Sequence, residues 1–389
     1  MTPSLLRARF ATSLSDVEAA AWDDCANCGR DPSERYNPFV SHAFLSALER
    51  SGSVGPRTGW TPSHALIEDE AGRLVAAAPA YIKTHSLGEY VFDQSFAEAY
   101  RRAGGRYYPK IQVAVPFTPA TGPRLLLARD APDEAEGGLI EALRALRRSR
   151  QASSLHLTFA TEPETTRLAA QGFLHRVGEQ FHFLNEGYRD FEDFLDALSS
   201  RKRKAIKRER REALSADLEI ELLTGSDLER RHWDAFFAFY MHTGARKWGR
   251  PYLTRAFFDE VGAAMPERIL LVLARKGADY IAGALNFLGD DAIYGRHWGA
   301  IEERPFLHFE LCYHQAIDYA IRNGFKRVEA GAQGEHKLAR GYRPVPTHSA
   351  HEFADAGLHA AVAQYLTRER EAVAAMVGEY EEALPFRRG

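Results

Sequence analysis

Hydrophobic and polar positions in the second half of the chain alternate between strand and helix periods. Residues 269–275, 280–288 and 292–300 are largely apolar and are separated by glycine-containing turns, which predicts three strands joined in hairpins. A long helix over 306–322 and a short strand over 326–330 follow. This order predicts an α/β fold, with a mixed central sheet flanked by helices on both sides.

The first half shows a similar order of elements. Strands are predicted over 64–68 and 74–83, with a hairpin between them, and a third over 89–93. The two halves align loosely at an offset of about 205 residues, which indicates a duplication. A chain of 389 residues also exceeds the length that one hydrophobic core usually serves. We therefore predict two domains, 1–185 and 186–389, with the probable active site in the second.

The composition is that of an ordinary globular protein, and the net charge creates no strong electrostatic field around it. Hydrophobic residues make up 45%, charged residues 26%, and the net charge is −3, so attraction to nucleic acid or lipid must be local. No stretch has the length of a secretory signal or a membrane span, so we expect a cytoplasmic protein. Three cysteines argue against a disulfide framework. Neither the Cys25/Cys28 pair nor the histidines have zinc-site spacing, so no metal is expected.

The most distinctive stretch is 328–342, where a short apolar strand enters a glycine-rich turn. Glu329 ends the strand, and a carboxylate, an imidazole and two cations follow the turn. Glycines allow tight turns and close approach to a ligand, and successive N–H groups there can bind an anion. The alternative is that this stretch is only the loop that follows a strand, with its charged side chains in solvent.

Residues 201–211 contain eight cations and one acid with helical spacing. Such dense cations repel one another along a helix, which favours an anion-binding role for Lys202, Arg203 and Lys207 over a merely solvated face. A basic-aromatic loop over 246–252 adds further cations.

The predicted strand 292–300 carries polar residues among apolar ones. Alternation would place Tyr294, Arg296 and Trp298 on one side and His297 on the other. A cation in a strand otherwise suited to burial needs a partner, so Arg296 is expected to meet a carboxylate.

The order of elements resembles the GNAT acyltransferase fold, and two such domains in tandem resemble the FemAB-type peptidyltransferases. Six stretches look like those of predicted bacterial FemAB-like N-acyltransferases: YVFDQSFAEAY (90–100), SSRKRKAIKRERR (199–211), RKWGRPY (246–252), YGRHWG (294–299), PFLHFE (305–310) and EAGAQGEHKLARGY (329–342). The resemblance implies an acidic residue at the strand end, Glu329, followed by Gly331, and a lysine in the next loop, Lys337. The pyrophosphate loop of ordinary GNAT enzymes is replaced by residues 302–305.

We therefore expect an N-acyltransferase that moves an acyl or aminoacyl group from aminoacyl-tRNA or acyl-CoA to a small-molecule or peptide amine. No tightly bound cofactor is expected, and tRNA is a partner if it carries the donor. The alternative is a non-catalytic nucleic-acid- or nucleotide-binding protein that uses the basic helix 201–211. The candidate catalytic residues are Glu329, Glu335, His336 and Glu310. The candidate substrate-binding residues are Lys202, Arg203, Lys207, Arg246, Lys247, Trp248, Tyr294, Arg296, Trp298, His308, Gln333, Lys337, Arg340, Tyr342 and Asp93.

Overall fold

The computed structural model describes residues 6–27, 35–214, 217–247, 251–331 and 334–387. The chain forms two compact units, one of residues 1–178 with 346–374 and the other of residues 179–345 with 375–389. The dividing positions fall inside strands β9 (Leu174–Leu184) and β15 (Arg343–Phe353) and helix α12 (Ala356–Glu382). They differ from the predicted domain limits because residues 346–374 belong to the first unit.

The first unit contains two sheets. One is antiparallel, in the order β1-β3-β4-β7, and the other has the order β15-β8-β6-β5-β2. The strand limits are β1 Arg7–Ala11, β2 Trp60–Pro62, β3 His64–Glu68, β4 Leu74–Ala78, β5 Ala80–Lys83, β6 Lys110–Val113, β7 Leu126–Leu127 and β8 Ser154–Ala160. The predicted strand over 89–93 is wrong, since these residues form a loop that leads into α3 (Gln94–Arg102).

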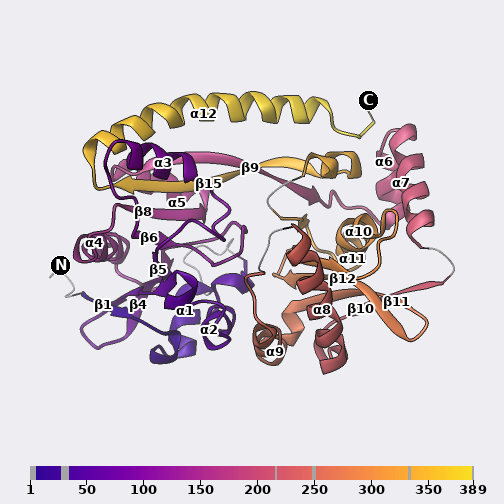
Figure 1. Ribbon diagram of the computed structural model, residues 1–389, viewed down its shortest axis with the longest axis horizontal. Coiled ribbons are helices and arrows are strands. Elements are labelled where there is room, and N and C mark those ends of the chain that lie inside the picture. Colours follow the sequence, from indigo (N-terminus) through magenta and orange to yellow (C-terminus); the bar gives the residue numbers. More distant parts are fainter. Residues whose placement is uncertain (1–5, 28–34, 215–216, 248–250, 332–333, 388–389) are drawn as a thin grey trace. The chain divides into compact units, whose positions relative to one another are not determined.

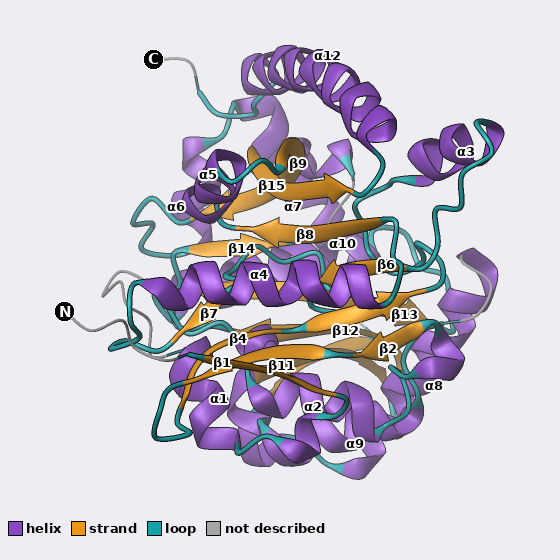
Figure 2. Cartoon of the chain, turned by 90° about the vertical axis from the view of Figure 1, so that its left-hand side faces the viewer, coloured by secondary structure: helices purple, strands orange, loops and turns teal. Residues whose placement is uncertain are grey.

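Helices of the first unit form where apolar residues recur at helical spacing. In α4 (Glu134–Ser149), Leu139, Leu143 and Leu146 are buried, and the helix packs across β3 and β4 of one sheet and β6 and β8 of the other (Figure 2). The remaining helices are α1 (Ala19–Ala26), α2 (His42–Arg50), α5 (Glu162–Ala170) and the first part of α12.

The second unit is built on a mixed sheet in the order β10-β11-β12-β13-β14-β9. Strands β10 to β13 are antiparallel, β13 and β14 are parallel, and β14 and β9 are antiparallel. The strands predicted over 269–275, 280–288, 292–300 and 326–330 are confirmed as β11 Ile269–Lys276, β12 Asp279–Leu288, β13 Ala292–Ala300 and β14 Arg327–Glu329, and the sheet also contains β10 Leu218–Leu223.

Helices cover both faces of this sheet. Helix α8 (Arg230–Lys247) packs on β12 and β13 (Figure 1), followed by α9 (Arg255–Ala264). The predicted helix over 306–322 is α10 (Leu307–Phe309), a π-helical segment (Glu310–His314) and α11 (Gln315–Arg322). These segments lie on the face of the sheet opposite α8. The same face carries α6 (Phe191–Ala197), α7 (Ser200–Ala213) and the 3₁₀ segment Glu335–Arg340. Within the described ranges, no helix combines the length and the apolar character needed to cross a bilayer.

Candidate active site

Strand β13 contains a bulge at Arg296. His297 and Gly295 pair with successive residues of β12, so Arg296 has no opposite residue in that strand. One extra residue reverses the alternation of side chains beyond it. Tyr294 and His297 therefore share one face and Trp298 lies on the other. The predicted common side for Tyr294, Arg296 and Trp298 is wrong because plain alternation takes no account of a bulge.

The parallel pairing of β13 with β14 is short. It covers three residue pairs and ends at Tyr294 and Glu329. A side-chain carbon at Gly295 would lie 3.5 Å from the Glu329 carbonyl oxygen, an ordinary van der Waals contact. Past this pair β13 stays on β12, whereas the chain after Glu329 turns at Gly331, whose φ is +80°. The parallel ladder therefore ends at this pair, although Ala330 and Gly331 still lie beside Gly295.

Glu329 ends β14, and one of its carboxylate oxygens is paired with an arginine. Its side chain is buried, and Oε1 accepts a hydrogen bond of 3.0 Å from Arg327 Nε. Oε2 has no hydrogen-bond donor in the described chain, and the Nε2 atom of His182 lies 3.8 Å away. Burial lowers the pKa of His182, although the Glu329 charge opposes that shift. The free Oε2 therefore faces a neutral imidazole and can accept a proton or a hydrogen bond.

Lys337 holds the glycine-rich turn by a hydrogen bond to its backbone. Its buried Nζ donates to the Gly331 carbonyl oxygen at 2.9 Å, and burial lowers its pKa to about 8. Glu335 and His336 begin the 3₁₀ segment with exposed side chains. Glu335 accepts a hydrogen bond of 2.8 Å from the Tyr380 hydroxyl.

His336 joins an aromatic cluster on the sheet face that carries Trp298. The Tyr313 hydroxyl lies 2.9 Å from His336 Nε2, and the Phe309 ring centroid lies 5.6 Å from that of His336. His308 connects this group to Trp298, with ring centroids 5.1 Å apart. The structure thus brings together His336, His308 and Trp298. It places Glu329 and Tyr294 on the opposite face of the sheet.

A cavity of about 600 Å³ adjoins Trp298 and His308. Its walls are Thr243, Arg246, Trp298, Ala300, Glu302, Glu303, Arg304, Pro305, Leu307 and His308. Both arginines are paired with acids, Arg246 with Glu303, and Arg304 with Asp217 (2.8 Å) and Glu302 (2.7 Å). Thr243 and Arg304 were not predicted from the sequence as residues of this cavity. The unusual segment 302–305 was a signal that could have pointed to Arg304.

Helix α7 packs within the second unit through Glu209 and the neighbouring Arg210. Arg210 Nη2 lies 3.1 Å from the fully buried carboxylate of Glu310, which also accepts a 2.6 Å hydrogen bond from Gln315. Arg340 binds Glu209 at 2.9 Å and lies over the Phe309 ring. Glu310 and Arg340, predicted as a base and a substrate ligand, are therefore both engaged inside the fold.

The outer side of α7 presents what we call the cationic stripe. Arg201, Lys204, Arg208 and Arg211 are exposed and follow the spacing i, i+3, i+7, i+10 of one helix face. Of these, Arg208 lies 3.6 Å from Glu212. Of the predicted ligands, Arg203 pairs with Asp196 at 2.6 Å and Lys207 with Glu192 at 2.5 Å, whereas Lys202 is half-buried. The sequence shows this spacing, but these four cations were not predicted as a group.

The other predicted residues lie outside these groups. Trp248 and Gln333 lie outside the described residues, and Lys247 ends α8 with its side chain likewise outside the description. Tyr342 is buried and its hydroxyl has no hydrogen-bond partner in the described chain. Asp93 belongs to the first unit. Among the residues that the structure describes, no group of three or more histidines, cysteines and acids could hold a metal ion.

Comparison with known proteins gives a family and a fold. The model of the FemAB-like family, described as peptidoglycan biosynthesis/recognition, matches residues 13–388. The crystal structure of FemX is similar at 12% identity, covering 92% of this chain and 100% of that chain, with a TM-score of 0.54. A tandem GNAT protein from the clavulanic acid biosynthesis pathway is also similar, at 12% identity over 90% of this chain and 99% of that one, with a TM-score of 0.48. No curated protein matches the sequence significantly. The predicted family and the predicted α/β fold class are confirmed.

Proposed function

The chain belongs to the FemAB-like family of peptidoglycan biosynthesis/recognition, and from this premise we propose that it is an acyl- or aminoacyltransferase acting on an amine. The observation that carries the proposal is the end of the β13–β14 ladder at Tyr294 and Glu329, with a carboxylate oxygen there that has no hydrogen-bond donor in the described chain. We propose that an extended acyl group binds at the end of this ladder, where backbone N–H groups past the last pair can donate to its carbonyl oxygen.

The reaction joins the amine nitrogen to the acyl carbon and breaks the bond from that carbon to an ester oxygen or thioester sulfur. The attacking amine must lose a proton, and the free Oε2 of Glu329 is the proposed acceptor. The leaving oxygen or sulfur must gain one, and we assign this step to Glu329 as well, which passes on the proton that it has taken from the amine. Lys337 positions the turn through the Gly331 carbonyl and does not itself react.

Two features favour an aminoacyl-tRNA over an acyl-CoA as the donor. The cationic stripe offers exposed charges along a helix face, which suits a phosphate backbone. In contrast, the arginines at the cavity rim are neutralised by Glu302, Glu303 and Asp217, so a pyrophosphate would meet no net positive charge there.

The test is a transfer assay with purified protein, a radiolabelled aminoacyl-tRNA or acyl-CoA, and a peptidoglycan-type peptide bearing a free amine. The proposal predicts labelled amide product with the tRNA donor. The cationic stripe also fits a protein that only binds nucleic acid. Saturable tRNA binding without product from either donor would favour that second function and contradict ours.

A further inference from the structure

Strand β14 is held on both sides by neighbouring strands. It pairs with β13 in parallel and with β9 in antiparallel register, so its backbone is fixed at all three of its residues. Successive side chains of a strand point to opposite faces of the sheet. Val328 is fully buried in the hydrophobic core of the second unit, and Arg327 and Glu329 therefore share the other face.

The guanidinium group of Arg327 uses each of its three nitrogens for a different partner. Its Nε donates to Glu329 Oε1 at 3.0 Å, and its Nη1 donates to Asp291 Oδ1 at 2.7 Å. Its Nη2 donates to the hydroxyl oxygen of Tyr294 at 3.3 Å. A guanidinium group is a rigid, planar fork, so three partners in different directions fix its position. Arg327 therefore holds Glu329 Oε1 at a defined point.

The other two partners of Arg327 are themselves held by the sheet. The carbonyl oxygen of Asp291 accepts hydrogen bonds from the backbone N–H groups of Lys326 at 2.8 Å and Arg327 at 3.2 Å. Tyr294 is buried, and it pairs with Glu329 at the end of the parallel ladder. Arg327 thus connects the Glu329 carboxylate to two groups whose places are set by the backbone.

A further contact leaves the second oxygen of Glu329 free. His182 is the partner of Glu329 in the antiparallel register with β9, and its Nε2 lies 3.2 Å from Gln180 Oε1. An amide oxygen only accepts, so His182 Nε2 carries a proton and donates it to Gln180. The distance from His182 Nε2 to Glu329 Oε2 is 3.8 Å, and this oxygen has no hydrogen-bond donor in the described chain.

We propose that Arg327 is a positioning residue for the transfer reaction. It fixes the Glu329 carboxylate through Oε1, and thereby holds Oε2 in the orientation in which it accepts the proton of the amine. Arg327 does not touch the reacting atoms and acts only through Glu329. The inference rests on the proposed function, in which Glu329 is the proton acceptor.

A double-mutant cycle on kcat tests this role. Arg327→Met should lower kcat by up to about a hundredfold, the loss that follows when a reacting group is displaced by about 1 Å, and should leave KM unchanged. In the Glu329→Gln background the same substitution should lower kcat no further, because there is no base left to position. An equal loss in both backgrounds, a wild-type kcat, or a change in KM alone would overturn the proposal.

Two further variants separate position from charge. Arg327→Lys keeps the charge but loses the fork, so it should be as slow as Arg327→Met, and full activity would overturn the proposal. Arg268→Met is the matched control, since Arg268 is a partly exposed arginine of the same unit that pairs with Asp290 at 3.0 Å. It should keep the wild-type kcat, and a loss equal to that of Arg327→Met would show a general effect of removing an arginine and overturn the proposal.

If Arg327→Met does not fold, Asp291→Asn takes its place in the cycle. This variant weakens only the contact with Nη1, so a smaller loss of kcat is expected. An unchanged kcat would overturn the proposal.

Crystal structures of the wild type and of the variant distinguish failure of this inference from failure of the proposed function. We expect the Glu329 carboxylate to rotate in the variant and its Oε2 to accept a hydrogen bond from His182. A carboxylate that keeps its wild-type position overturns the positioning role, whether or not the protein transfers acyl groups. A carboxylate that rotates supports the positioning contact, and full activity of Glu329→Gln would then overturn the proposed function instead.

Discussion

Tyr294 and Glu329 form the last pair of the parallel ladder between β13 and β14. At the end of this ladder, Glu329 carries a carboxylate oxygen that has no hydrogen-bond donor in the described chain. The bulge at Arg296 follows within two residues and turns Trp298 to the other face. Glu329 and the Trp298 cluster therefore lie on opposite faces of the sheet.

Replacing Glu329 by Gln should lower kcat about a hundredfold to ten-thousandfold, the usual range for loss of a general base. The substitution keeps the shape of the side chain, so folding should persist, as checked by circular dichroism. Glu335→Gln is the matched control, because Glu335 is exposed and bonded to Tyr380. A kcat for Glu329→Gln within twofold of wild type would remove Glu329 from the chemistry.

Replacing Arg201, Lys204 and Arg211 together by Ser should weaken tRNA binding and flatten its salt dependence. Each lost phosphate contact reduces the slope of log K against log salt by about 0.7 to 0.9, so three contacts reduce it by about 2 to 3. The measurement is filter binding across a salt series. Arg203→Ser with Lys207→Ser is the control, since both cations already pair with acids. An equal loss in the control would show that only total charge matters.

Glu310→Gln should destabilise the protein while leaving the turnover of folded molecules unchanged. Removing one partner of a buried ion pair costs about 3 kcal/mol, at the low end of the usual range because Arg210 is partly exposed. Denaturant unfolding gives the free energy, and initial rates corrected for the folded fraction give turnover. If turnover fell as it does in Glu329→Gln, Glu310 would be a catalytic group.

Lys83→Met should change how stability depends on pH. In wild type the folded Lys83 releases its proton near pH 7, whereas an unfolded lysine holds it to about 10.5. Between these values the unfolded chain binds more protons, so this residue makes the free energy of unfolding rise with pH, by up to about 1.4 kcal/mol per unit. The variant should lack that rise in denaturant titrations at pH 7 to 10. Parallel curves would show that Lys83 titrates normally.

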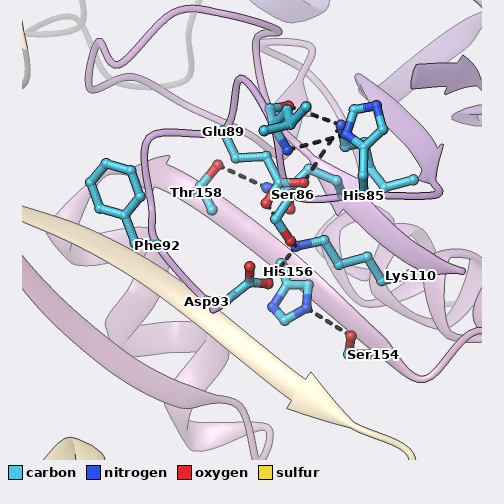
Figure 3. Close-up of polar contacts among 12 residues, drawn as sticks. His85, Ser86, Glu89, Phe92, Asp93, Lys110, Ser154, His156 and Thr158 are labelled. Atoms are coloured by element: carbon cyan, nitrogen blue, oxygen red, sulfur yellow. Dashed lines mark hydrogen bonds and ion pairs between the residues drawn. The ribbon is translucent and has the colours of Figure 1, made fainter. Parts of the chain in front are cut away.

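Much of the fold could be predicted because local pattern and tertiary packing agree. The strands around β11, β12 and β13 and the helix ending at Arg322 follow directly from apolar periodicity. The segment 89–93 was mispredicted, because Glu89 and Asp93 point inward to bind Lys110, a partner remote in sequence (Figure 3). A buried ion cluster of this kind overrides the local preference for a strand.

The candidate site could be predicted only in part. Glu329 was proposed from its position at a strand end and from the family resemblance, and its role stays a prediction. The ion pairs of Glu310, Arg340 and Arg203 depend on acids or cations brought to them by tertiary structure, so the sequence could not reveal them. The bulge at Arg296 follows from the register with β12, which a single strand does not reveal.

The most direct measurement is a crystal structure with a stable analogue of the donor, an aminoacyl-adenosine in which an amide replaces the ester. We predict that its acyl carbonyl lies at the end of the β13–β14 ladder, past the Tyr294–Glu329 pair, with Glu329 Oε2 open to an incoming amine. An analogue bound elsewhere on the protein, with the end of this ladder empty, would contradict the account.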